Sequence, residues 1–89
     1  MKTIENSFQQ MLDNIPADTR LEIDWSFAIA NRIDYLIKKN GLSKRSFAEA
    51  LGKRPSEVSK WLSGQHNFTL RTLATISAYF GEELIHPRG

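Results

Sequence analysis

Apolar residues recur along the chain at intervals of three and four, which is the spacing of one face of an α-helix. Five such stretches follow one another between residue 4 and residue 80. No segment alternates apolar and polar residues as a half-buried strand would. The pattern therefore predicts an all-α fold of five helices without a sheet.

The first predicted helix covers residues 4–15 and ends at Pro16, because the residue before a proline is pushed out of the helical region. Its apolar stripe consists of Ile4, Phe8, Met11, Leu12 and Ile15. We expect residues 16–24 to form a polar linker, so that residues 1–24 make an N-terminal arm. The stripe must be buried on the chain's own core, on a second copy or on a partner.

The other four predicted helices form one domain over residues 25–81, followed by a tail over residues 82–89 that is either extended or frayed. The second helix is expected to run from about residue 24 or 26 to Asn40. Ser43 and Thr69 are residue types that cap helix N-termini, and Pro55 suits a first helical position. The side chains predicted to face the core are Ile29, Ile33, Leu36, Ile37, Phe47, Ala48, Leu51, Val58, Trp61, Leu62, Leu70, Leu73, Ala74, Ile76, Ser77 and Phe80.

The third and fourth predicted helices, residues 43–51 and 55–63, are joined by only Gly52, Lys53 and Arg54. Two helices linked by such a short turn with a glycine are typical of a helix-turn-helix. Ala48 is small enough for the two helices to approach closely, and glycine supplies the positive φ that a tight turn needs. The second helix of this unit is then held at the surface, where it can enter a DNA major groove.

Residues 42–52 and 58–64, followed by residues 67–73, resemble the Cro/repressor-type (Xre) helix-turn-helix family. The resemblance covers about residues 29–81, which is more than half of the chain. It rests on the order and spacing of several loose motifs rather than on any single one. It implies a lambda-repressor-like fold and a protein that binds double-stranded DNA.

The chain departs from the family pattern at four positions. Lys44 stands where the family often has a glutamine that braces a phosphate contact, and Arg54 stands where a serine or threonine often caps the recognition helix. Pro55 replaces a residue that is frequently polar and reads a base, and Leu62 replaces an acidic residue. These differences affect which DNA sequence is bound more than they affect the fold.

The net charge of +2 is unevenly distributed along the chain. Residues 38–71 hold eight basic and two acidic side chains, whereas the segments before and after are net acidic. A basic half suggests a face that meets an anion, although an ordinary solvated surface is the alternative. Trp61 could stack on a nucleotide, but its helical spacing from Val58 favours a place in the core.

The exposed face of the fourth helix supplies the candidate base-reading residues, which are Ser56, Ser59 and Lys60. The candidate phosphate-binding residues are Lys44, Lys53, Arg54, Gln65, His66 and Asn67. For each group the alternative is a solvated polar surface without a ligand. The residue types fit the acceptors of guanine and the oxygens of phosphate.

Several function classes find no support in the residue inventory. The chain has no cysteine, and its two histidines, His66 and His86, lack metal-ligand spacing. It also lacks a nucleophile motif and a phosphate-cradling glycine loop, so we expect no enzyme, no metal and no cofactor. No apolar run is long enough for a membrane span or a signal peptide. We expect a cytoplasmic, bacterial protein that is associated with the nucleoid when it binds DNA.

The function predicted from these observations is a sequence-specific, repressor-like transcriptional regulator that acts as a homodimer. One recognition helix makes too few base contacts to select a genomic site, whereas two half-sites double the readout. The alternative is an antitoxin that binds a toxin protein and also regulates its own operon. In that case the N-terminal arm would be a natural partner-binding element.

Overall fold

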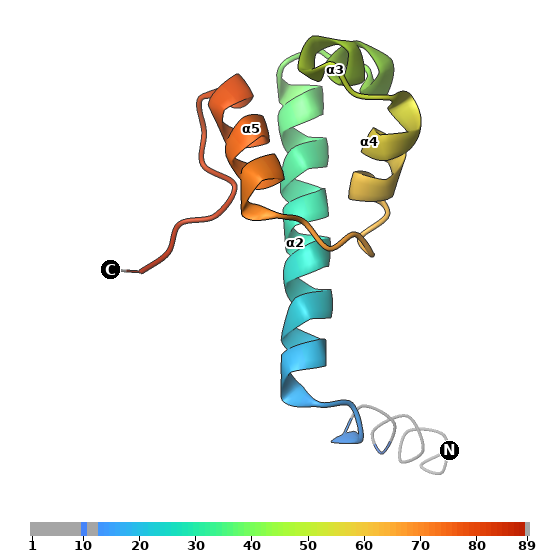
Figure 1. Cartoon of the computed structure of the whole chain (residues 1–89), viewed down its shortest axis with the longest axis vertical. Helices are drawn as coiled ribbons and strands as arrows, with labels where there is room; N and C mark the ends of the chain where they lie inside the picture. The colour runs from blue at the N-terminus through green and yellow to red at the C-terminus, as the bar shows by residue number, and fades with distance from the viewer. Residues whose placement is uncertain (1–9, 11–12, 89) are drawn as a thin grey trace.

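The computed structural model describes residue 10 and residues 13–88, and that part of the chain contains four helices and no strand. The helices are α2 (Ala17–Lys39), α3 (Lys44–Leu51), α4 (Pro55–Leu62) and α5 (Leu70–Phe80). The long helix α2 forms the axis of the molecule, with α4 and α5 on either side of it (Figure 1). Helix α3 lies across the C-terminal end of α2 and connects it to α4. The prediction of an all-α fold is confirmed.

Helix α2 begins earlier than the sequence pattern predicts, and the linker expected over residues 16–24 was wrong. Pro16 is the residue before the helix, with φ −55° and ψ 146°, and Asp18 lies in the first turn. A carboxylate there stabilises the positive end of the helix dipole, and the segment that follows is rich in good helix formers. The polar composition of residues 16–24 resembles that of a loop, although residues 17–24 belong to α2. The predicted helix over residues 4–15 lies almost entirely outside the described residues.

The predicted caps of α3 and α5 are confirmed. The Ser43 hydroxyl oxygen accepts the backbone N–H of Ser46 at 3.0 Å, and the Ser46 hydroxyl oxygen accepts that of Ser43 at 2.9 Å. The Thr69 hydroxyl oxygen accepts the N–H of Thr72 at 3.1 Å. Each contact satisfies a backbone donor that the first helical turn leaves without a partner.

Helix α4 begins differently, because Arg54 precedes it and offers no side-chain acceptor. The carboxylate of Glu57 in the first turn instead accepts the backbone N–H of Arg54 at 3.3 Å. This is the reciprocal half of a capping box, and its negative charge also lies at the positive end of the helix dipole. The structure thus compensates locally for the missing serine or threonine.

Phe47 lies at the centre of the core and is fully buried. Its ring stacks on Phe80 with the centroids 5.3 Å apart and meets the edges of Trp61 and Tyr79 at 6.2 and 5.8 Å. Trp61 is only 4% exposed, which confirms its prediction as a core residue. The buried hydrophobic residues are Ala30, Ile33, Leu36, Ile37, Phe47, Ala48, Val58, Trp61, Leu73 and Ile76.

Two residues predicted to face the core from α5 are exposed. Leu70 is 75% exposed, and Ala74 also lies at the surface. The core covers α5 only along the side that carries Leu73, Ile76 and Phe80. Leu70 and Ala74 are four residues apart on a neighbouring stripe of the helix that no other element covers.

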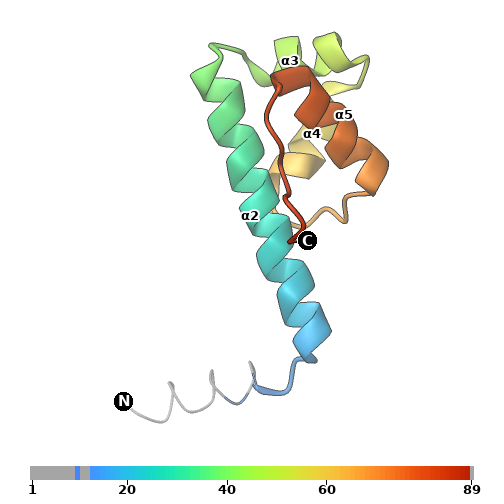
Figure 2. The same ribbon diagram turned by 90° about the vertical axis from the view of Figure 1, so that its left-hand side faces the viewer.

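The tail after α5 is extended and follows α2 (Figure 2). Leu84 packs against the core, and its N–H donates to the Ser77 hydroxyl at 3.1 Å. The carboxylate of Glu82 pairs with Arg32 at 2.9 Å and with Lys39 at 3.3 Å. These contacts attach the tail to α2 along its C-terminal half.

The N-terminal part of α2 projects beyond the other helices, as both views show (Figures 1 and 2). We call residues 17–28 the stem. Its large apolar side chains are 44–63% exposed, and they are Leu21, Ile23, Trp25 and Phe27. Trp25 is the most exposed of them, and an exposed tryptophan on a projecting helix indicates a contact surface.

Candidate nucleic-acid interface

The turn between α3 and α4 has the geometry of a helix-turn-helix. Gly52 has φ 68° and ψ 31°, in the left-handed region where a residue with a Cβ is strained. The N–H of Lys53 donates to the Ala48 carbonyl at 2.8 Å, and that of Gly52 donates to Glu49 at 3.1 Å. Ala48 is fully buried in the core. The predicted role of Gly52 in the turn is confirmed, whereas the role of Ala48 in the close approach of the two helices stays a prediction.

Helix α4 is anchored along one side and exposed along the other. Val58 and Trp61 are buried, whereas Ser56, Ser59 and Lys60 are exposed. The three exposed residues lie at positions i, i+3 and i+4, so they share one face of the helix. The structure therefore brings the three predicted base-reading residues together on a surface that a DNA groove could receive.

The basic residues of the segment 38–71 divide into two groups by their ion pairs. Three of them are paired with carboxylates, namely Lys38 with Asp34, Lys39 with Glu82 and Arg45 with Glu49, at 2.9–3.3 Å. Five make no ion pair with any residue in the described part of the chain: Lys44, Lys53, Arg54, Lys60 and Arg71. We call these five the unpaired cations. Lys60 lies on α4, Lys53 and Arg54 lie in the turn before it, and Lys44 and Arg71 lie in the first turns of α3 and α5, so that their positive charge is left for an anionic ligand.

The loop after α4 places its three predicted residues differently. Gln65 and Asn67 are exposed, whereas the ring of His66 is partly buried, with its centroid 4.8 Å from that of Phe68 in an edge-to-face contact. The backbone N–H of Gln65 already donates to the Ser63 hydroxyl at 3.1 Å. The side chains of Gln65 and Asn67 are therefore the groups of this loop that face solvent.

Arg71 is a candidate that the sequence reasoning did not single out. It lies in the first turn of α5, close in sequence to the loop after α4, and it is exposed and unpaired. The only sequence signal was its place in the basic segment, because helical spacing does not say which cations have partners. Its position beside the positive end of the α5 dipole favours a negatively charged ligand.

The described residues contain no group of three or more histidine, aspartate or glutamate side chains placed to hold a metal ion. Within the same part of the chain, no helix is both long enough and apolar enough to cross a membrane.

A family model described as helix-turn-helix matches residues 33–85 of the chain. The match covers more than half of the 89 residues. It runs from the middle of α2 through α3, α4 and α5 to the tail and leaves the stem outside. Comparisons with curated proteins and with solved structures gave no significant match.

Proposed function

The chain belongs to the Cro/repressor-type helix-turn-helix family of DNA-binding regulators, and from this premise we propose that it is a sequence-specific transcriptional repressor. The observation that carries the proposal is the exposed face of α4, where the side chains of Ser56, Ser59 and Lys60 are all open to solvent. We infer that this face enters the major groove of double-stranded DNA.

The base contacts in this proposal come from Lys60, Ser56 and Ser59. A lysine ammonium can donate to the N7 and O6 acceptors of guanine, and a serine hydroxyl can donate to or accept from either base of a pair. Pro55 has no side-chain donor, so its neighbours carry the reading. An α-helix with its side chains is about 10–12 Å in diameter, which fits the width of the major groove.

The phosphate contacts in this proposal lie beyond both ends of α4. Lys44, Lys53 and Arg54 precede the helix in the chain, while Gln65, Asn67 and Arg71 follow it. Contacts at both ends would fix the position of the helix on the duplex without reading its sequence. His66 is retained as a weaker candidate, because its ring packs against Phe68.

The repressor acts as a homodimer in this proposal, since one short recognition helix reads only a few base pairs. Two copies on adjacent half-sites double the number of base contacts. We place the protein in the bacterial cytoplasm, associated with the nucleoid when it is bound to DNA. It needs no cofactor, metal or catalytic group for this function.

Replacing Lys60 and replacing Lys44 are expected to have different effects on a DNA site selected from a random pool. Lys60→Ala should weaken binding to the selected site by about 1–3 kcal/mol and relax the preference at one or two base pairs. Lys44→Ala should weaken binding to all sequences about equally, because it removes only a phosphate contact. Fluorescence anisotropy with the selected duplex and with a scrambled duplex measures both effects.

The scrambled duplex is the control for this comparison. If Lys60→Ala weakens both duplexes by the same factor, Lys60 binds phosphate and base reading passes to Ser56, Ser59 or Arg54. If no sequence is enriched from the random pool, the proposal of a sequence-specific repressor is wrong.

The antitoxin alternative shares the DNA-binding unit and adds a protein partner that binds away from α4. The repressor proposal is preferred because DNA alone accounts for the exposed face of α4, without a second protein. Co-expression with the product of the neighbouring gene tests the alternative. A stable complex that neutralises a toxic neighbour would favour the antitoxin.

A further inference from the structure

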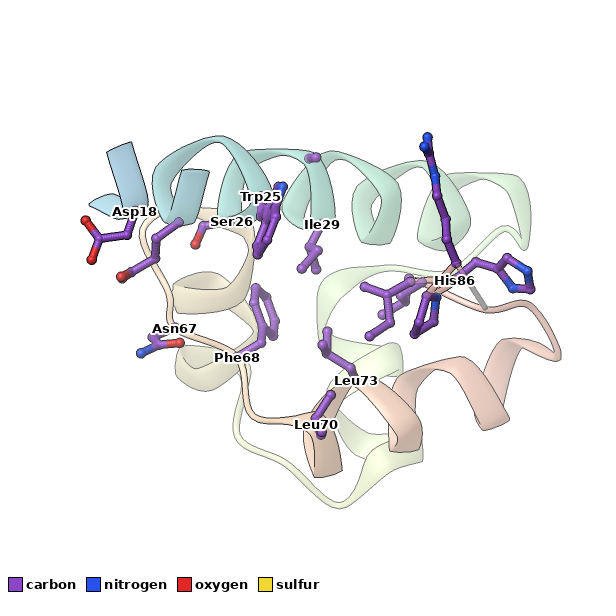
Figure 3. A pocket seen from close by; sticks show the side chains of 15 residues that line it. Asp18, Trp25, Ser26, Ile29, Asn67, Phe68, Leu70, Leu73 and His86 are labelled. Atoms are coloured by element: carbon purple, nitrogen blue, oxygen red, sulfur yellow. The ribbon is translucent and has the colours of Figure 1, made fainter. Parts of the chain in front are cut away.

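An apolar groove of about 970 Å³ runs beside the stem (Figure 3). Its walls come from the stem, the loop after α4, the first half of α5 and the tail. The apolar side chains that matter most here are Trp25, Ile29, Phe68, Leu70, Leu73 and Ile85. Asn67 is the one proposed DNA contact among the residues that line the groove, and no residue of α4 lines it, so the proposed DNA contacts do not account for it.

The groove is open rather than enclosed. Trp25 is 63% exposed, Leu70 is 75% exposed and Ile85 is 37% exposed. A site for a small molecule usually buries most of its ligand, which these exposed walls would not do. A broad apolar surface with a tryptophan in it is typical of a contact between proteins.

The described residues that immediately precede α2 lie on its other side. Residues 13–16 lie beside Arg20 and Asp24, where together they border a second, shallower hollow. Helical geometry directs Arg20 and Asp24 to roughly the opposite side of α2 from the groove-lining residues Glu22 and Trp25. The direction in which the chain leaves α2 therefore favours an occupant from another molecule.

The charges at the ends of the groove indicate which molecule this is. Asp18 and Glu22 border one end on α2, and Arg88 borders the groove on the tail. Figure 3 shows Asp18 and His86 towards opposite ends, with Trp25 and Ile29 between them. A second copy turned by 180° would bring Asp18 and Glu22 of each copy towards Arg88 of the other.

We propose that this groove is the self-association surface of the protein and that the same groove of a second copy covers it in a two-fold dimer. The inference rests on the homodimer of the proposed function and identifies the surface through which its two copies meet. Trp25 and Leu70 form the apolar centre, and the charges of Glu22 and Arg88 set the antiparallel orientation. Such a two-fold interface uses the same patch on both copies.

The proposal is tested by sedimentation equilibrium of the full chain carrying one new carboxylate. Trp25→Glu should raise the dimer dissociation constant by about 30-fold or more, because a central tryptophan is a frequent hot spot. Leu70→Glu introduces the same charge on α5 and should act in the same direction. Ile23→Glu is the matched control, since Ile23 is an exposed stem residue outside the groove, and it should change the constant by less than about threefold.

Circular dichroism melts verify that each variant folds. The proposal is overturned if the wild-type chain is a monomer at about 100 μM, well above the micromolar range of ordinary protein association. Equal weakening by Trp25→Glu and Ile23→Glu also overturns it, because the effect would then not belong to the groove.

A charge exchange tests the orientation of the two copies. Glu22→Lys alone and Arg88→Glu alone should each weaken the dimer by about threefold, as expected for exposed ion pairs. The double variant should restore the wild-type constant, because the opposite charges meet again across the interface. If the two effects add instead, the antiparallel arrangement is wrong.

DNA binding separates this inference from the proposed function. A folded Trp25→Glu chain that still binds a scrambled duplex like the wild type but has lost affinity for the selected site supports the inference. A wild-type dimer that binds no DNA would overturn the proposed function, but it would not contradict the inferred dimer interface.

Discussion

Raising the salt concentration from 50 to 200 mM is expected to weaken binding to a scrambled duplex by about 150-fold for each bound protomer. The four unpaired cations assigned to phosphate, Lys44, Lys53, Arg54 and Arg71, are the cause, because each phosphate that is neutralised releases about 0.9 of a counterion. The logarithm of the affinity should therefore fall with the logarithm of salt concentration with a slope of about −3.6. Anisotropy titrations at several salt concentrations measure this slope.

Two variants show which cations produce the slope. Lys44→Ala should lower its magnitude by about 0.9, whereas Lys38→Ala should leave it nearly unchanged, because Lys38 is paired with Asp34 at 2.9 Å. If the affinity for the scrambled duplex does not change with salt concentration, the proposal that the protein binds DNA is wrong. Equal changes in the two variants would mean that the DNA contacts are not concentrated around α4.

Gly64→Ala is expected to destabilise the protein by about 2–5 kcal/mol, more than the same change at another turn. Gly64 has φ 81° and is buried, and a Cβ placed there would overlap the ring of Phe27 from the stem. The strain of the left-handed backbone contributes about 1–2 kcal/mol, and the overlap contributes about 1–3 kcal/mol. The midpoint of thermal unfolding should fall by roughly 8–40 °C.

Gly52→Ala is the matched control, since Gly52 has φ 68° but a Cβ there would meet no atom within 4 Å. It should show only the backbone strain of about 1–2 kcal/mol. In a Phe27→Ala background, Gly64→Ala should cost no more than Gly52→Ala, because the overlapping ring is gone. If the cost of Gly64→Ala is unchanged in that background, Phe27 does not confine Gly64.

Much of the helix-turn-helix could be predicted because the responsible interactions are local. Ser43 and Thr69 cap their helices through hydrogen bonds to residues three positions away. Gly52 adopts the positive φ expected from its place in a three-residue turn. The exposed face of α4 follows from helical periodicity, since Val58 and Trp61 fix the side that is buried.

Sequence patterns predict less well those features that depend on distant residues. The polarity of residues 17–24 predicts a linker, yet these residues continue α2. Leu70 was placed in the core because it is apolar, but α5 is covered only on the side of Leu73 and Ile76. Periodicity predicts that a helix has an apolar stripe, whereas its neighbours decide how much of the stripe is buried.

By itself, the sequence determined the helix boundaries from Ser43 onward, the turn at Gly52 and the polar face of α4, because each depends on hydrogen bonds and spacing within a few residues. Only the tertiary structure decided which cations are paired, since Lys39 meets Glu82 from 43 positions away. It also decided that Gly64 lies against Phe27 and that Trp25 shares a groove with Leu70 and Ile85. Such contacts join segments far apart in the chain, and they form only when the whole core is packed.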